Sequence, residues 1–233
     1  MKIQQYLNTN AEDILSKKNN IFIPICLGNK FFSYKGVLNE NIEKYLMWAL
    51  SNTKEKVLFI VVDKIQNTNF FVRNNSKSEQ ASLEHVLREG DILKCEIDKL
   101  IKKLPENFQK KVEVIRWSDY ENSDPLCREI TEIVYREFKD NDDFRNNVLE
   151  SVKSSVTDRE FSEESYLRLC NYVLDEFCVA YSGIEYKGEY FGLYLYPDTD
   201  AVLYLIEGIK MGDIFKELQD KLPKQKTGVL ILN

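Results

Sequence analysis

Apolar residues follow two different periods along the chain, and together they predict alternating strands and helices. Runs in which nearly every residue is apolar, such as "IFIPICL", are typical of strands buried on both faces of a sheet. Longer stretches with an apolar residue at every third or fourth position are typical of amphipathic helices. The predicted strands are 21–27, 56–63, 111–117, 189–196 and 227–232. The predicted helices are 39–52, 76–104, 124–139, 142–157, one that begins at Ser162, 200–209 and 212–222.

This alternation predicts an α/β fold: one Rossmann-like domain over residues 1–233, with a mostly parallel sheet flanked by helices. The chain has 233 residues, of which 43% are hydrophobic, so it can bury a full core. No Pro/Gly/Ser-rich linker or internal repeat divides it. Ligands of such sheets bind beyond the carboxyl ends of the strands, so candidate chemistry is expected there.

Composition excludes several classes of protein. No apolar run reaches the roughly 18–20 residues of a membrane span, and residues 1–20 lack the apolar core of a secretory signal. We therefore expect a cytoplasmic protein that does not enter membranes. The five cysteines are scattered, odd in number and without a CxxC pair, so we expect free thiols. They are Cys26, Cys95, Cys127, Cys170 and Cys178.

Motifs for cofactors are missing from the sequence. It contains no GxGxxG, no GxxxxGK[ST] and no acidic cluster placed to hold a metal ion. We expect neither a nucleotide cofactor nor a metal. His85 is the only histidine, so a Cys/His dyad or a histidine metal site would have to use it.

Cys26 closes the first predicted strand, in "PICLGNKFFS", and two interpretations fit it. A cysteine at a strand end is most often a small buried hydrophobic residue. Gly28 and Asn29, however, predict a sharp turn with a side-chain amide beside the sulfur at the ligand-binding edge of the sheet. A thiol needs no strong base to act as a nucleophile. The residues alone leave both interpretations open.

Two further segments carry candidate polar groups. Tyr172 and Glu176 are four residues apart in a predicted helix, so they share one face and could act on one amine or hydroxyl. They could equally be a half-exposed aromatic ring and a solvated carboxylate. Tyr196 ends a predicted strand and would lie near Cys26 if the two strands are neighbours. Its phenol suits a proton relay, although strand tyrosines usually serve packing.

Basic residues gather on one face of the helix 76–104. At about 100° per residue they fall within a sector of about 100°, whereas the apolar residues occupy another sector. The basic residues are Lys77, Arg88, Lys99, Lys102 and Lys103. The formal net charge of −6 argues against a polyanion partner, so a solvated outer face is one interpretation. A row that follows an RNA backbone is the other, and a kink at Gly90 would disrupt it.

Three segments in this order and at these separations resemble the signature segments of tRNA-dependent cyclodipeptide synthases. They are "PICLGNKFFS", "NYVLDEF" and "YLYPDTD", and the intervening "RWSDYENSDPLCREITEIVYREFKDNDDF" is also similar to that family. The resemblance covers the chain from about Ile21 to Ile206. It implies a fold similar to class I aminoacyl-tRNA synthetase catalytic domains without their ATP-binding motifs.

The resemblance also implies an activity. Such enzymes use two aminoacyl-tRNAs and release a cyclic dipeptide, a 2,5-diketopiperazine, by a ping-pong mechanism through an acyl-enzyme. The aminoacyl ester is already activated, so ATP is not needed. We therefore expect aminoacyl-tRNAs as partners and either a monomer or a homodimer.

Carried over by position, Cys26 stands where the family has its nucleophilic serine. Tyr172 and Glu176 match the pair that holds the aminoacyl ammonium group, and Tyr196 matches a tyrosine that relays protons during cyclisation. Asn29 is typical of one subfamily, whereas Tyr196 followed by proline is typical of the other. The basic helix face corresponds to a tRNA-binding surface in the family.

Two rival hypotheses come from other classes of protein. A cysteine hydrolase of small esters or amides would also use Cys26, but its only histidine, His85, is expected far from the strand ends. A non-catalytic RNA-binding module derived from a synthetase would keep the basic face and not need Cys26 at all.

Overall fold

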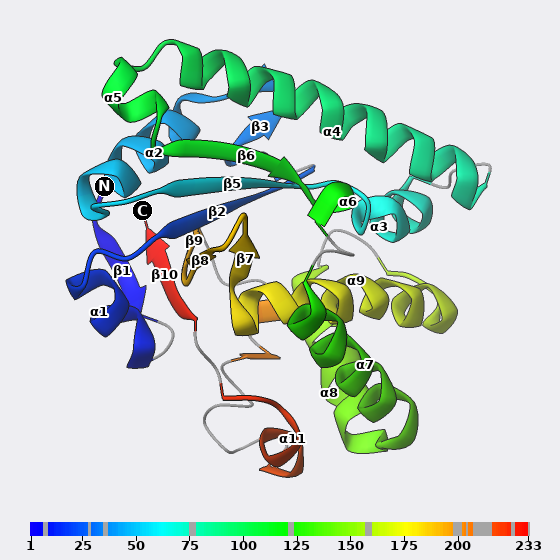
Figure 1. Cartoon of the computed structure of the whole chain (residues 1–233). Coiled ribbons are helices and arrows are strands. Elements are labelled where there is room, and N and C mark those ends of the chain that lie inside the picture. The colour runs from blue at the N-terminus through cyan, green and yellow to red at the C-terminus, as the bar shows by residue number, and fades with distance from the viewer. Residues whose placement is uncertain are drawn as a thin grey trace.

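The computed structural model describes residues 1–6, 9–27, 29–34, 37–74, 78–120, 124–156, 160–197, 202–203, 205–206, 216–224 and 227–232. Strands and helices alternate along most of this length (Figure 1). The strands are β1 Ile3–Tyr6, β2 Ile21–Cys26, β3 Ser33–Tyr34, β4 Val37–Leu38, β5 Val57–Val62, β6 Val112–Arg116, β7 Ile184–Tyr186, β8 Glu189–Phe191, β9 Leu193–Tyr196 and β10 Gly228–Leu232. The helices are α1 Thr9–Ser16, α2 Glu40–Asn52, α3 Gln66–Arg73, α4 Glu79–Lys102, α5 Glu106–Gln109, α6 Trp117–Tyr120, α7 Pro125–Asp140, α8 Asp142–Ser155, α9 Glu163–Ser182 and α11 Lys216–Lys221.

Six strands form the main sheet, in the order β1-β10-β9-β2-β5-β6. The five strands from β10 to β6 run parallel, and only β1 at the edge is antiparallel. The chain builds β2, β5 and β6 outward in one direction and then returns to add β9 and β10 on the other side of β2. This confirms the predicted α/β fold with a mostly parallel sheet.

The pleat of the strands divides the core into two layers. In β2, Ile21, Ile23 and Ile25 pack on the side of α2 and α4, whereas Phe22 and Cys26 pack on the side of α7, α8 and α9. β5 and β9 alternate in the same way, because successive side chains of a strand point to opposite faces. Figure 1 shows α4 above the sheet and α7, α8 and α9 below it.

The segment 189–196 is predicted as one strand, and this is wrong. It divides at Gly192: β8 pairs with β7 in a separate hairpin, and β9 joins the main sheet. A Cβ at Gly192 would lie 2.6 Å from Cε1 of Tyr190. The missing side chain lets the Tyr190 ring fold over the chain where its direction changes.

Several elements are not predicted from the pattern. The helices α1, α3, α5 and α6 have only four to eight residues each, too few for a helical period to stand out. β1 is exposed at three of its four positions, so it carries no apolar run. Of the predicted helix 200–209, residues 202–203 and 205–206 are helical and the rest lie outside the described residues, as do residues 212–215 of the last helix.

The long helix α4 runs unbroken through Gly90, where the sequence left a kink open. A Cβ at Gly90 would lie 2.7 Å from Cβ and Oδ2 of Asp63 at the end of β5. Asp63 is fully buried and accepts hydrogen bonds from Arg116 Nε at 2.6 Å and Ser118 Oγ at 3.0 Å. The glycine therefore allows the helix to approach a buried carboxylate. No described helix has the length and hydropathy to cross a bilayer.

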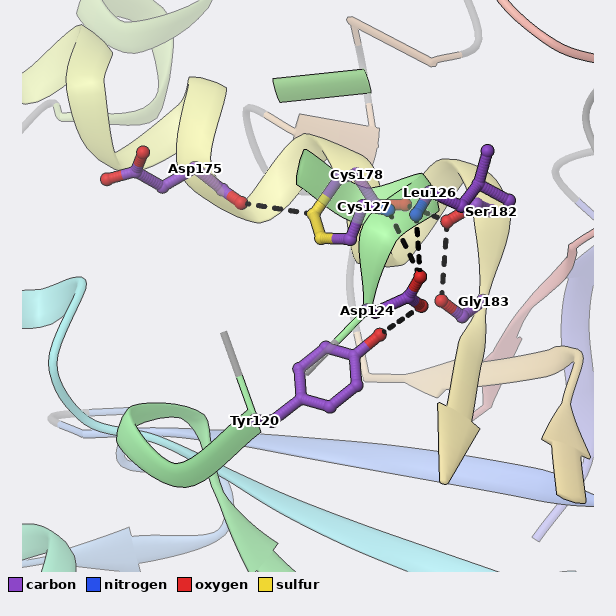
Figure 2. The surroundings of a disulfide bond; sticks show 8 residues. All are labelled: Tyr120, Asp124, Leu126, Cys127, Asp175, Cys178, Ser182 and Gly183. Carbon is purple, nitrogen blue, oxygen red and sulfur yellow. Dashed lines mark hydrogen bonds between the residues drawn. A yellow bond between two sulfur atoms is a disulfide. The ribbon is translucent and has the colours of Figure 1, made fainter. Parts of the chain in front are cut away.

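The expectation of five free thiols is wrong. Cys127 of α7 and Cys178 of α9 form a disulfide bond (Figure 2), although 51 residues separate them. The packing of α7 against α9 brings them together, which spacing along the chain did not indicate. Cys26 and Cys170 are buried and lie outside this disulfide, as does the exposed Cys95.

Candidate active site

The candidate site lies where the order of the sheet reverses. β2 and β9 are adjacent and parallel, with Phe22 paired to Tyr194, and the chain leaves these two strands in opposite directions across the sheet. Parallel α/β sheets bind ligands beyond the carboxyl ends of the strands at such a switch point. Cys26 ends β2 and Tyr196 ends β9, so both residues lie at this crevice edge.

Cys26 contacts three polar side chains from two other elements. Its Sγ lies 3.6 Å from Oη of Tyr172 and 3.9 Å from Oε1 of Glu176, both on α9. Oη of Tyr196 donates to the same sulfur at 3.5 Å. The four candidate residues, which are spread over 171 positions of the sequence, therefore meet at one point.

The pleat and the helix period explain this meeting. Cys26 and Tyr196 project from the sheet face that α9 covers, and Tyr172 and Glu176 stand one turn apart on the helix. Cys26 is 5% exposed and Glu176 is 1% exposed, whereas Tyr172 is half-buried. The site is thus a cluster of mostly buried polar groups that reaches solvent at Tyr172.

Tyr194 belongs to this cluster and was not singled out from the sequence. Its Oη donates to Oε1 of Glu176 at 3.4 Å, and its ring packs edge-on against Phe22. The sequence could have indicated Tyr194, because it stands two positions before Tyr196 and side chains two apart in a strand share a face. The Glu176 carboxylate is therefore held between a phenol and a thiol.

Asn29 lies beside Tyr196, as the turn after β2 directs it. Its Nδ2 donates to Oη of Tyr196 at 3.2 Å, and its Oδ1 accepts from the N–H of Phe31 at 2.9 Å. Its own N–H donates to the carbonyl of Cys26 at 3.1 Å. The amide thus orients a phenol that in turn contacts the sulfur. Gly28, the other residue predicted in this turn, lies outside the described residues.

The histidine stands apart from this cluster. His85 lies on α4, where its ring packs 5.0 Å from that of Phe70 and its Nδ1 is 3.1 Å from Arg88. None of its described contacts joins it to Cys26. Across the described parts of the chain, no group of three or more His, Cys, Asp or Glu residues is arranged to hold a metal ion.

The basic row on α4 is exposed wherever the structure describes it. Val86, Leu93 and Ile97 are buried, as predicted for the opposite side of this helix. The exposed members are Arg88, Lys99, Lys102 and Lys103. Lys99 is paired with Glu96 at 2.6 Å, so part of its charge is balanced locally. Lys77 lies outside the described residues.

Several cyclodipeptide synthases of known structure share this architecture. No protein-family model matches the sequence, and no curated protein matches it. A cyclodipeptide synthase from Bacillus thermoamylovorans superposes with a TM-score of 0.78 at 18% identity, covering 98% of this chain and 94% of that one. A cyclo(L-leucyl-L-phenylalanyl) synthase superposes with a TM-score of 0.72 at 17% identity, over 98% and 96%.

A third structure extends the likeness to synthetases. It is a Mycobacterium tuberculosis protein described as showing that cyclodipeptide synthetases are related to type I tRNA synthetases, with a TM-score of 0.76 at 15% identity over 97% and 90% of the two chains. At these identities the likeness concerns backbone architecture. The chain has the fold that cyclodipeptide synthases share with class I aminoacyl-tRNA synthetases.

Proposed function

We propose that this protein is a tRNA-dependent cyclodipeptide synthase, an aminoacyltransferase that joins two aminoacyl groups into a 2,5-diketopiperazine. One observation carries the proposal: within this fold, Cys26, Tyr172, Glu176 and Tyr196 converge at the carboxyl edge of the sheet. A nucleophile and an amine-binding pair at one point suit a reaction that moves an acyl group bearing an amine.

In the first step, the Cys26 thiolate attacks the ester carbonyl of an aminoacyl-tRNA. A C–S bond forms, the C–O bond to the terminal ribose breaks, and the tRNA leaves as an alcohol after protonation. Of the polar groups around Cys26, the Glu176 carboxylate accepts the thiol proton, directly or relayed through a phenol. The same proton passes to the leaving ribose oxygen, so Glu176 is ionised again. Glu176 and Tyr172 then bind the ammonium group of the aminoacyl thioester by charge and hydrogen bonding.

In the second step, the bound aminoacyl group becomes the nucleophile. Glu176 accepts a proton from its ammonium, and the amine attacks the ester of a second aminoacyl-tRNA, releasing the second tRNA. The free amine of the resulting dipeptidyl thioester attacks the thioester carbonyl, the C–S bond breaks, and the ring leaves. Tyr196 lies 3.5 Å from the sulfur and returns a proton to it. No step consumes ATP.

The exposed row on α4 is the proposed tRNA surface, with Arg88, Lys99, Lys102 and Lys103 contacting phosphates. Lys77 precedes the helix and extends the row in the sequence. The part of α4 next to Arg88 is held at the same sheet edge as the site, because Nη2 of Arg116, at the end of β6, donates to the carbonyl of Leu87 at 2.9 Å. Lys99, Lys102 and Lys103 lie more than three turns farther along the helix. Aminoacyl-tRNA is a cytoplasmic substrate, so we place the enzyme in the cytoplasm.

One incubation distinguishes this proposal from its rivals. The protein is mixed with a pool of charged tRNAs, and the small products are analysed by mass spectrometry. A synthase yields cyclic dipeptides, a cysteine hydrolase yields free amino acids only, and an RNA-binding module yields nothing above the uncatalysed background. Intact-protein mass spectrometry should also show an aminoacyl adduct that disappears in Cys26→Ala. Cyclic dipeptide formation by Cys26→Ala at the parent rate would rule out the thioester.

A further inference from the structure

A disulfide bond ties α7 to α9 beside the candidate site (Figure 2). Cys127 lies in the first turn of α7, and Cys178 lies near the end of α9. Their Cα atoms are 5.0 Å apart, within the range of about 4.4–6.8 Å that a disulfide spans without backbone movement. Both residues are buried. The bond thus fixes the position of α9 from the side of α7.

α9 carries the disulfide and the site on neighbouring faces. Tyr172 and Glu176 point to the site, whereas Asp175 and Cys178 face α7, where Oη of Tyr135 donates to Oδ1 of Asp175 at 2.9 Å. Successive residues of a helix are turned by about 100°, so these two stripes are about a third of a turn apart. Any shift of α9 against α7 therefore moves the residues that contact Cys26.

Hydrogen bonds that do not involve sulfur hold both cysteines in place. Asp124, the N-cap of α7, accepts from the N–H of Cys127 at 3.3 Å and from Oη of Tyr120 at 2.8 Å. On the other helix, Oγ of Ser182 donates to the carbonyl of Cys178 at 2.8 Å. These bonds are unaffected by reduction of the disulfide. The two thiols would stay close together, which favours reversible closure over permanent opening.

A pocket gives small molecules access to the bond. Its volume is about 340 Å³, and Trp117, Arg128, Glu132 and Asp175 line it together with both cysteines. This is the lower end of the size range of small-molecule sites and too small for a folded protein. Cys170 differs, because burial raises the pKa of its thiol to about 12 and keeps it protonated.

We propose that Cys127 and Cys178 form a reversible exchange site for a low-molecular-weight thiol. The thiolate attacks Sγ of Cys127, which at 5% is more exposed than Cys178 at 1%. The S–S bond breaks, a mixed disulfide forms, and Cys178 leaves as a thiolate that takes a proton from water. A second small thiolate attacks the mixed disulfide, releases the small disulfide and leaves Cys127 as a thiol after protonation. Two electrons pass from two small thiols to the protein.

The consequence is control over how firmly α9 is held. In the oxidised form, α9 is covalently tied to α7 and the contacts of Cys26 are fixed. In the reduced form, α9 is held by packing and hydrogen bonds alone, and the site opens more often. The thiol exchange does not depend on the proposed function. Only the effect of the exchange on turnover rests on the proposed function.

The first experiment measures the exchange. The full chain carrying Cys95→Ser, which removes the exposed thiol, is equilibrated with reduced and oxidised glutathione at a series of ratios and quenched in acid. It is then denatured at neutral pH in excess N-ethylmaleimide, which traps buried thiols as well. Peptide mass spectrometry should show Cys127 and Cys178 becoming trapped together as the reduced fraction rises, with Cys170 trapped at every ratio. The proposal is overturned if the bond survives excess reduced glutathione, or if both thiols are free at every ratio.

The second experiment measures the coupling to the site without tRNA, so its failure is distinct from failure of the proposed function. Iodoacetamide should label Cys26 about fivefold faster in the reduced chain, equivalent to about 1 kcal/mol of easier opening. The double variant Cys127→Ser/Cys178→Ser should label like the reduced chain, and Cys170→Ser like the oxidised parent. Equal labelling of the oxidised and reduced parent would overturn the coupling, whether or not the double variant folds.

Discussion

Replacing Glu176 by glutamine is the sharpest test of the proposed amine-binding pair. The side chain is 1% exposed. Its Oε1 accepts a hydrogen bond from Oη of Tyr194 at 3.4 Å and lies 3.9 Å from Sγ of Cys26. Glutamine keeps the size of the side chain and one acceptor oxygen. It removes only the negative charge, which the proposed mechanism needs twice: to bind the ammonium group and to accept its proton.

The size of the effect follows from these surroundings. A hydrogen bond to a charged group contributes about 1.5–3 kcal/mol, and 1.4 kcal/mol corresponds to a factor of about ten. Lost binding alone should therefore lower kcat/KM about 10- to 150-fold, and loss of the base should lower it further. Folding should respond in the opposite direction, because a buried carboxylate is costly to desolvate and a neutral amide is less so. We expect an unchanged or slightly higher Tm.

The assay is the initial rate of cyclic dipeptide formation from charged tRNA, with Tm measured on the same preparations. Glu163→Gln is the matched control, since it makes the same chemical change on the exposed first turn of the same helix. It should keep parental turnover. If Glu176→Gln turned over at the parental rate, the assignment of Glu176 to the amine would be refuted.

Three further variants test the fold and the tRNA surface. Gly90→Ala places a Cβ 2.7 Å from the buried Asp63 and should lower the free energy of unfolding in urea by about 1–3 kcal/mol. An unchanged urea midpoint would contradict the close approach of α4 to Asp63. Burial raises the pKa of the Glu113 carboxyl, but hydrogen bonds from two lysines outweigh it and lower the net pKa. Glu113→Gln should therefore lower the free energy of unfolding by about 0.5–1 kcal/mol at pH 7. The difference from the parent should shrink as the pH falls from 4.5, the ordinary pKa of the carboxyl, through its lowered pKa in the folded chain. A difference that does not depend on pH would speak against the ion pairs. Lys99→Glu with Lys102→Glu should weaken tRNA binding about tenfold or more at low salt, with only a small drop in Tm from the lost Lys99–Glu96 pair and the reversed charges in the last turn of α4. Unaltered affinity in a salt titration would favour a merely solvated face.

The local pattern of apolar and polar residues in the sequence determined most of the strands and long helices. Apolar runs specified β2, β5, β6 and β10 and located β9 within a longer segment, and periods of three to four residues specified α2, α4 and α7 to α9, because both signals come from burial along one element. The i, i+4 spacing placed Tyr172 and Glu176 on one helix face. The position of Cys26 at a strand end put it at the edge where such sheets bind ligands.

Tertiary structure decided what lies next to what. The adjacency of β2 and β9 brings Tyr196 to Cys26, and the packing of α9 on that face completes the cluster and adds Tyr194. The disulfide between α7 and α9 arises in the same way. Each of these contacts joins residues more than fifteen positions apart, and chain spacing carries no information about them until the layers are packed. Gly192 divides a strand for a related reason, since the ring that crowds it folds back only in the finished hairpin.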